Sequence, residues 1–112
     1  MSQLTTHVLD TSRGKPAEGI LVILYADGSG NWQEMAKGTT NADGRIADLL
    51  PTGILLAAGL YKIKFFTRPY FEQLAVASFY PYVEIVFEIS SQAHYHIPLL
   101  LGPFGYTTYR GS

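Results

Sequence analysis

Residues 82–89 read YVEIVFEI, and this stretch decides the fold class of the chain. Apolar and charged residues alternate along it. Successive side chains of an extended strand point to opposite faces, so the two kinds are expected on opposite sides of a sheet. The core-facing set is Val83, Ile85, Phe87 and Ile89, and the charged positions of the opposite face are Glu84 and Glu88. The stretch therefore predicts a β-strand with one buried face and one solvent face.

Short runs of similar character occupy much of the chain and are separated by turn sequences. The tetrapeptides DGSG at 27–30 and NADG at 41–44 suit tight turns, because glycine adopts the positive φ that such turns require. No alternation of strands with long helices occurs, so the pattern favours two packed antiparallel sheets over an α/β fold. The other expected strands are residues 4–11, 19–25, 32–40, 46–50, 60–67, 94–101 and 104–109.

One segment, TRPYFEQLAVA at 67–77, departs from the strand pattern and predicts a short helix. Thr67 is expected to cap it, and Pro69 fits the first turn, where a backbone N–H has no partner inside the helix. The residues that share one face at helical spacing are Tyr70, Phe71, Leu74 and Ala75. We therefore expect an all-β sandwich of two antiparallel four-stranded sheets with one short helix, forming a single domain over residues 1–112.

The composition excludes several classes of protein. Of 112 residues, 47% are hydrophobic and 15% are charged, which excludes a disordered chain. Lys and Arg number 8 against 9 Asp and Glu, so we expect no nucleic-acid partner and no membrane partner. The absence of cysteine excludes disulfides, thiolate metal sites and a cysteine nucleophile. No secretory signal and no membrane-spanning apolar segment is recognisable, so we expect a cytoplasmic protein.

Histidines are the candidate chemical groups. His94 and His96 are two residues apart on an expected strand, so both side chains leave the same face, and His7 lies on the face opposite Val8. Two imidazoles on one face can bind a metal or share a proton. Zinc would need further ligands, and no spacing in the sequence demands them, so we expect no metal. The residues alone predict a β-sandwich with a histidine-rich site and leave its reaction open.

Three motifs carry a resemblance to a known family: LTTHVLDT at 4–11, TNADGR at 40–45 and HYHIPLLLGPFGYTTYRGS at 94–112. They resemble the transthyretin-related proteins that act as 5-hydroxyisourate hydrolases, and the similarity extends over essentially the whole chain. The final YRGS is the most specific motif, because the hormone-carrying transthyretins lack it. Carriers also lack the residues that stand here as His7, Arg45 and His96. Departures from the family pattern occur at Ala93, Ile97, Gly102 and Thr107, where no chemical role is expected.

The resemblance implies a transthyretin-like sandwich that assembles as a homotetramer, a dimer of dimers. The implied reaction is hydrolysis of the cyclic amide of 5-hydroxyisourate, a step of urate degradation that yields a ureido-imidazoline carboxylate. No metal and no organic cofactor is implied. A non-catalytic transthyretin-like carrier of a small aromatic ligand remains an alternative. An immunoglobulin-like adhesion domain is a weaker alternative, because the chain lacks cysteines and a recognisable signal sequence.

The resemblance also assigns residues to roles. It implies His7, Arg45 and His96 as catalytic residues and Tyr109, Arg110 and Ser112 as residues that bind or enclose the substrate. The chemistry suits these types, because amide hydrolysis needs an activated water, stabilisation of an oxyanion and a proton for the leaving nitrogen. Either His7 or His96 would activate water. His94 would have a supporting role at most. Ser112 as a covalent nucleophile is a less favoured alternative.

Arg45 would hold the planar heterocycle, stabilise the oxyanion and favour neutral imidazoles. By strand alternation, His94 and His96 should stand on the outside of a sheet, and the resemblance implies that His7 lies beside them. Such a face is open, whereas a catalytic pocket must enclose a small ligand. A second copy of the chain is expected to supply the missing wall, so that the active sites lie between subunits.

Overall fold

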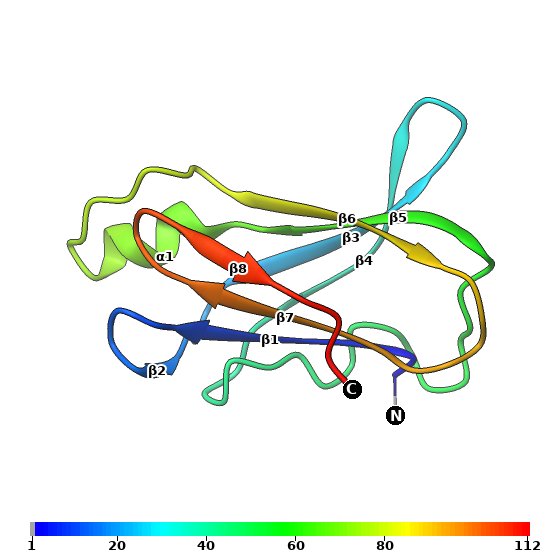
Figure 1. The fold of residues 1–112 in the computed structure, drawn as a ribbon, viewed down its shortest axis with the longest axis horizontal. Coiled ribbons are helices and arrows are strands. Elements are labelled where there is room, and N and C mark those ends of the chain that lie inside the picture. The colour runs from blue at the N-terminus through cyan, green and yellow to red at the C-terminus, as the bar shows by residue number, and fades with distance from the viewer. Residues whose placement is uncertain (1) are drawn as a thin grey trace.

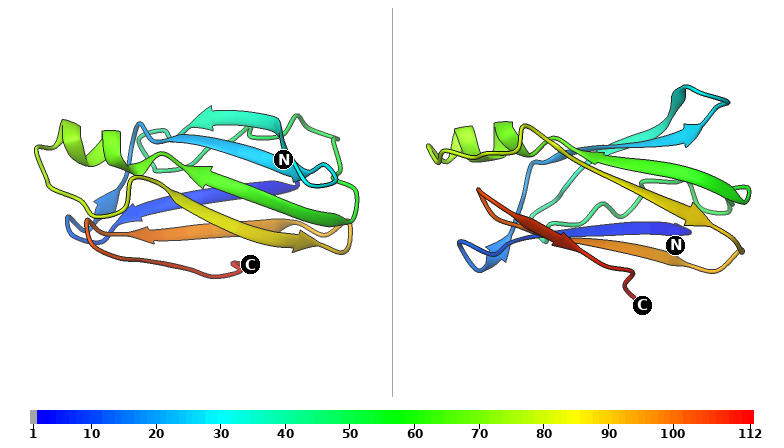
Figure 2. Two further views of the ribbon diagram at one scale, coloured as in Figure 1. Left: turned by 90° about the horizontal axis from the view of Figure 1, so that it is seen from above. Right: turned by 45° about the horizontal axis from the view of Figure 1, so that its top comes forward.

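The computed structural model describes residues 2–112, which fold into two four-stranded sheets packed face to face (Figure 1). One sheet has the strand order β2-β1-β7-β8 and the other the order β4-β3-β5-β6. Figure 2 shows the two layers from two further directions, with the helix at one end of the sandwich. The elements are β1 (Leu4–Asp10), β2 (Lys15–Pro16), β3 (Leu21–Asp27), β4 (Trp32–Thr39), β5 (Gly59–Phe65), α1 (Thr67–Gln73), β6 (Val83–Ile89), β7 (Tyr95–Leu101) and β8 (Tyr106–Thr108).

The core lies between the inner faces of the two sheets. On β6 the apolar positions face inward as the alternation predicts, with Val83 and Ile89 buried and Glu84 and Glu88 exposed. Burial alternates along β1 as well, whereas in β7 three consecutive residues, Ile97, Pro98 and Leu99, are buried. The fully buried large side chains of the core include Leu4, Val8, Leu24, Ile63, Phe65, Phe71 and Leu99. Two four-stranded sheets with one short helix are therefore confirmed.

Two expectations about the strands are wrong. The central pair β1 and β7 is parallel, with Thr5 opposite His96, whereas all other paired strands are antiparallel in the described residues 2–112. Residues 46–50 form no strand, although Ile46, Leu49 and Leu50 are buried. An apolar run can fill the core as irregular chain, and hydrophobicity alone does not distinguish this from a strand.

The helix is also capped differently from the expectation. Thr67 is the first residue of α1, Phe66 holds the cap position, and no side chain caps the helix. Thr67 is buried, and its hydroxyl finds no hydrogen-bond partner within residues 2–112. Tyr70 and Phe71 are buried as the helical spacing predicts, but the helix ends at Gln73, so Leu74 and the exposed Ala75 lie beyond it. No helix in the described part of the chain is long and apolar enough to cross a membrane.

A buried carboxylate ties the end of β1 to α1. Asp10 has no exposed surface, and its Oδ2 accepts a hydrogen bond of 2.7 Å from the hydroxyl of Tyr70. The other oxygen accepts bonds from the backbone and hydroxyl of Ser12 and from the backbone of Arg13. Burial raises the pKa of Asp10, but the bonds from Ser12, Tyr70 and Arg13 together outweigh it and leave the pKa below its usual value. The network fixes this end of the sandwich with the carboxylate ionised.

Candidate active site

The outer face of the sheet β2-β1-β7-β8 carries the histidines. His7 lies between Thr6 and Val8, which are both buried, so its own side chain points away from the core. His96 lies in the same way between two buried neighbours on β7. Both imidazoles are half-buried, whereas His94 is exposed and lies 6.4 Å from His96 between ring centroids, at an interplanar angle of 16°. The histidines thus point to the face that strand alternation predicted.

Arg45 reaches this face through a turn that runs alongside β1. The side-chain oxygen of Asn41 accepts hydrogen bonds from the backbone N–H groups of Asp43 and Arg45, at 2.9 and 3.1 Å. The carbonyl of Gly44 then accepts a bond of 2.8 Å from the backbone of Val8, and Arg45 forms an isolated antiparallel bridge with His7.

Gly44 is required at this turn for two reasons. Its φ is +72°, and a Cβ there would lie 2.4 Å from the carbonyl oxygen of Val8. The turn can therefore approach β1 closely enough to place Arg45 beside His7 only with glycine at position 44. This is the local reason why the sequence NADGR places its arginine at the site.

The C-terminal tail covers one side of His96. The backbone N–H of Gly111 donates a 2.8 Å hydrogen bond to the carbonyl of His96, which forms a second isolated bridge. A Cβ on Gly111 would lie only 2.5 Å from Cδ2 of the His96 ring and 3.3 Å from Cγ of Pro98. The glycine of YRGS thus packs directly on the imidazole, and the exposed Ser112 follows it.

The surroundings keep both half-buried imidazoles neutral. Burial lowers the pKa of His7, and the charge of Arg45 lowers it further, against smaller raising contributions from Asp43. Burial also lowers the pKa of His96, followed by the charges of Arg45, His94 and His7, while the backbone of Thr5 raises it. Neutral imidazole is the form that accepts a proton, so the site holds bases that are available at neutral pH.

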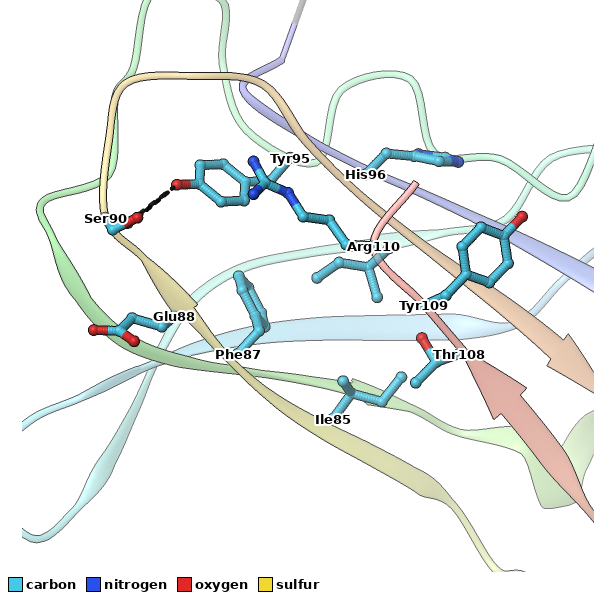
Figure 3. Close-up of a pocket in the computed structure, with 10 residues that line it drawn as sticks. Ile85, Phe87, Glu88, Ser90, Tyr95, His96, Thr108, Tyr109 and Arg110 are labelled. Atoms are coloured by element: carbon cyan, nitrogen blue, oxygen red, sulfur yellow. Dashed lines mark hydrogen bonds between the residues drawn. The ribbon is translucent and has the colours of Figure 1, made fainter. Parts of the chain in front are cut away.

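Two hollows adjoin the site. A hollow of about 270 Å³ on the histidine face is lined by Thr5, Asn41, Arg45 and His94, among others. A second, of about 340 Å³, opens between β6 and the tail after β8 and is lined by Phe87, Tyr95, Tyr109 and Arg110, among others (Figure 3). Of the tail residues expected to enclose the substrate, Tyr109 and Arg110 therefore border this second hollow, and Ser112 lines neither hollow.

Arg110 is exposed, and its guanidinium lies over the ring of Tyr95. Its guanidinium carbon lies 4.4 Å from the ring centroid of Tyr95, a cation–π contact that Figure 3 shows. The Tyr95 hydroxyl is bonded by the backbone N–H groups of Ser90 and Ser91 at 3.1 and 3.2 Å. Hydrogen bonds from the Ser90 and Ser91 side chains and backbones lower the pKa of Tyr95 to about 7. In this structure Arg110 anchors the tail, so its role in binding substrate stays a prediction.

Sequence reasoning missed three residues that shape the site: Thr5, Asn41 and Gly111. Thr5 had a signal that could have found it, because it is two residues from His7 and so shares the outer face. Within residues 2–112 no three side chains of His, Cys, Asp or Glu are grouped as a metal site would need. A reaction without metal remains a prediction.

Fold and site together define a transthyretin-type β-sandwich that carries two neutral imidazoles and an arginine on the outer face of one sheet. Residues 4–111 match the HIUase/Transthyretin family, and the chain belongs to that family. The 5-hydroxyisourate hydrolase of Mus musculus is 46% identical over 99% of this chain and 96% of its own length. The resemblance stated from the sequence motifs is thereby confirmed.

Solved structures agree with this assignment. The 5-hydroxyisourate hydrolase of Klebsiella pneumoniae superposes with a TM-score of 0.85 at 39% identity, covering 97% of this chain and 98% of that one. Sea bream transthyretin, solved in complex with thyroxine, superposes with a TM-score of 0.92 at 31% identity, covering 98% and 95%. The transthyretin-like fold class is confirmed, and the fold alone does not separate hydrolase from carrier.

Proposed function

We propose that this chain is a 5-hydroxyisourate hydrolase, which opens the cyclic amide of its substrate to a ureido-imidazoline carboxylate in urate degradation. The observation that carries the proposal is the gathering of His7, Arg45 and His96 on one outer face, beside the tail glycine Gly111. Relatives that are named 5-hydroxyisourate hydrolase cover nearly the whole chain, which supports the same activity. Neither a metal nor an organic cofactor takes part in the proposed reaction.

The geometry suits a water-activating mechanism. A neutral imidazole, from His7 or His96, takes a proton from water as the water attacks the amide carbon. The guanidinium of Arg45 stabilises the negative charge that develops on the carbonyl oxygen, because it is always charged and presents several N–H donors. The imidazolium then returns the proton to the leaving ring nitrogen.

The alanine variants His7→Ala, Arg45→Ala and His96→Ala test these roles. Each should lower turnover roughly a hundredfold or more, which is the usual contribution of a general acid–base group. Thermal unfolding should change little, because all three side chains lie outside the core. Arg68→Ala, which removes an exposed arginine on α1, is the matched control and should keep wild-type turnover. Wild-type turnover in any two of the three site variants would overturn the assignment.

A carrier remains the second candidate, because the sea bream transthyretin solved with thyroxine has the same fold at a TM-score of 0.92. The two functions differ in their effect on freshly prepared 5-hydroxyisourate, which decays spontaneously and can be followed by absorbance. A hydrolase accelerates the decay, whereas a carrier slows it or leaves it unchanged.

The proposed active protein is a cytoplasmic homotetramer with sites between subunits. Support comes from two apolar residues on the histidine face: Leu9 and Leu100 are register partners on β1 and β7, and both are half-buried. Their side chains leave the same outer face as those of His7 and His96, because each lies an even number of residues away on its strand. An apolar patch therefore adjoins the site on an otherwise open face. A second copy of the chain would cover this patch and would also enclose the site.

Leu100→Glu tests the shared-site assembly, because it places a charge on that face away from the catalytic positions. Sedimentation should give about four times the chain mass of 12.4 kDa for the wild type and a smaller species for the variant, with lower activity. Val86→Glu is the control, because Val86 is 56% exposed on the outer face of the other sheet. A fully active wild-type monomer would refute the shared site.

A further inference from the structure

The hydroxyl of Thr5 lies between two imidazoles. Its Oγ1 is 2.8 Å from Nδ1 of His96 and 3.0 Å from Nε2 of His94, both within hydrogen-bond distance. The contact follows from the parallel pairing of β1 and β7, in which Thr5 is the register partner of His96. His94 is two residues earlier on the same face as His96, which brings its ring to the other side of the hydroxyl.

A threonine hydroxyl has one proton, so it can donate to only one of these two nitrogens. We propose that Thr5 is a positioning residue that accepts a hydrogen bond from Nδ1–H of His96 and donates its own proton to Nε2 of His94. His96 is thereby held in the tautomer whose Nε2 carries no proton. This inference rests on the proposed hydrolase function and deepens it, because it makes Nε2 of His96 the base that takes the proton from water.

The surroundings of His94 suit this direction of the hydrogen bonds. His94 is exposed, and its ring can present Nε2 as an acceptor while water solvates the rest of it.

The opposite edge of the His96 ring is held by the tail. Gly111 packs against Cδ2, the carbon bonded to Nε2, so the ring is fixed between Thr5 on one side and the chain at Gly111 on the other. The charged and titratable groups that act on His96 are Arg45, His94 and His7, and each lowers its pKa. Together these contacts set both the orientation and the proton position of the base.

Nitrogen-15 NMR of histidine-labelled protein tests the arrangement without any substrate. At a mildly alkaline pH, where the imidazoles are neutral, wild-type His96 should show a protonated Nδ1 and an unprotonated Nε2. Thr5→Ser should keep this pattern because it keeps the hydroxyl. Thr5→Val, of nearly the same shape, should lose it. A wild-type His96 protonated at Nε2, or an unchanged pattern in Thr5→Val, would overturn the proposal.

Turnover supplies the second readout. Thr5→Val should lower kcat about tenfold to a hundredfold, a part of what a general base contributes, while KM stays within about twofold. Thr5→Ser should restore most of kcat. Thr39→Val, which alters an exposed threonine of β4 in the other sheet, should match the wild type. An inactive wild type would refute the hydrolase, and the NMR tautomer would still decide the position of the proton.

Discussion

Replacing Gly111 with alanine places a methyl group against the imidazole of His96. Gly111 does not adopt a positive φ, so alanine is compatible with its backbone conformation. The added Cβ would lie 2.5 Å from Cδ2 and 3.2 Å from Cγ of His96, and ordinary van der Waals contact begins near 3.4 Å. The ring or the tail must therefore move by about 0.9 Å, since Cγ of Pro98, at 3.3 Å, blocks a simple shift of the methyl group.

A displacement of about 1 Å at a catalytic group costs roughly a hundredfold in rate. We therefore expect Gly111→Ala to lower kcat/KM about a hundredfold, which corresponds to about 2.7 kcal/mol of transition-state stabilisation. Stability should change little, because the tail lies on the surface and the core is untouched. The loss should therefore be seen in the hydrolase assay and not in thermal unfolding.

Gly105→Ala is the matched control for this prediction. Gly105 also lacks a positive φ, and a Cβ built on it meets no atom within 4 Å. This variant should keep wild-type activity and stability. Equal activity of Gly111→Ala and Gly105→Ala would show that the position of the His96 ring does not control the reaction, and the reasoning would fail.

Three further predictions follow from the electrostatics and the hydrogen bonds. Arg45→Gln removes a charge that lowers the pKa of both His7 and His96, so the acid limb of kcat/KM should move to higher pH; a limb that stays in place would contradict the assigned bases. Tyr70→Phe removes the only donor to Oδ2 of the buried Asp10 among residues 2–112, and urea unfolding should show a loss of about 2 kcal/mol; an unchanged midpoint would mean that the bond contributes nothing. Prolonged chelation should leave turnover intact, whereas activity lost and then restored by zinc would make the histidines metal ligands.

The face on which the histidines stand was predictable from strand alternation. A period of two fixes which side chains share a face, so His7 and His96 could be assigned to the solvent side once their strands were recognised. The same period says nothing about strand direction, because parallel and antiparallel neighbours show the same alternation. The parallel pairing of β1 and β7, which brings Thr5 beside His96, therefore had to come from the structure.

Long-range packing accounts for most of what the sequence could not reveal. The apolar segment 46–50 contributes Leu49 and Leu50 to the core without joining a sheet, and a run of apolar residues does not distinguish these outcomes. The contact of Arg110 with the ring of Tyr95 depends on a hollow that β6, β7 and the tail after β8 form together. Such features arise only when segments distant in the chain meet.

The decay of freshly prepared 5-hydroxyisourate in large excess over the protein distinguishes a hydrolase from a carrier. For a hydrolase, the decay rate should rise in proportion to protein concentration, and an amount of substrate far above one equivalent should be converted completely. The His96→Ala variant at the same concentration should return the rate close to the spontaneous value. A rate that does not change with wild-type protein, or that falls as substrate is sequestered, would contradict hydrolysis and favour a carrier.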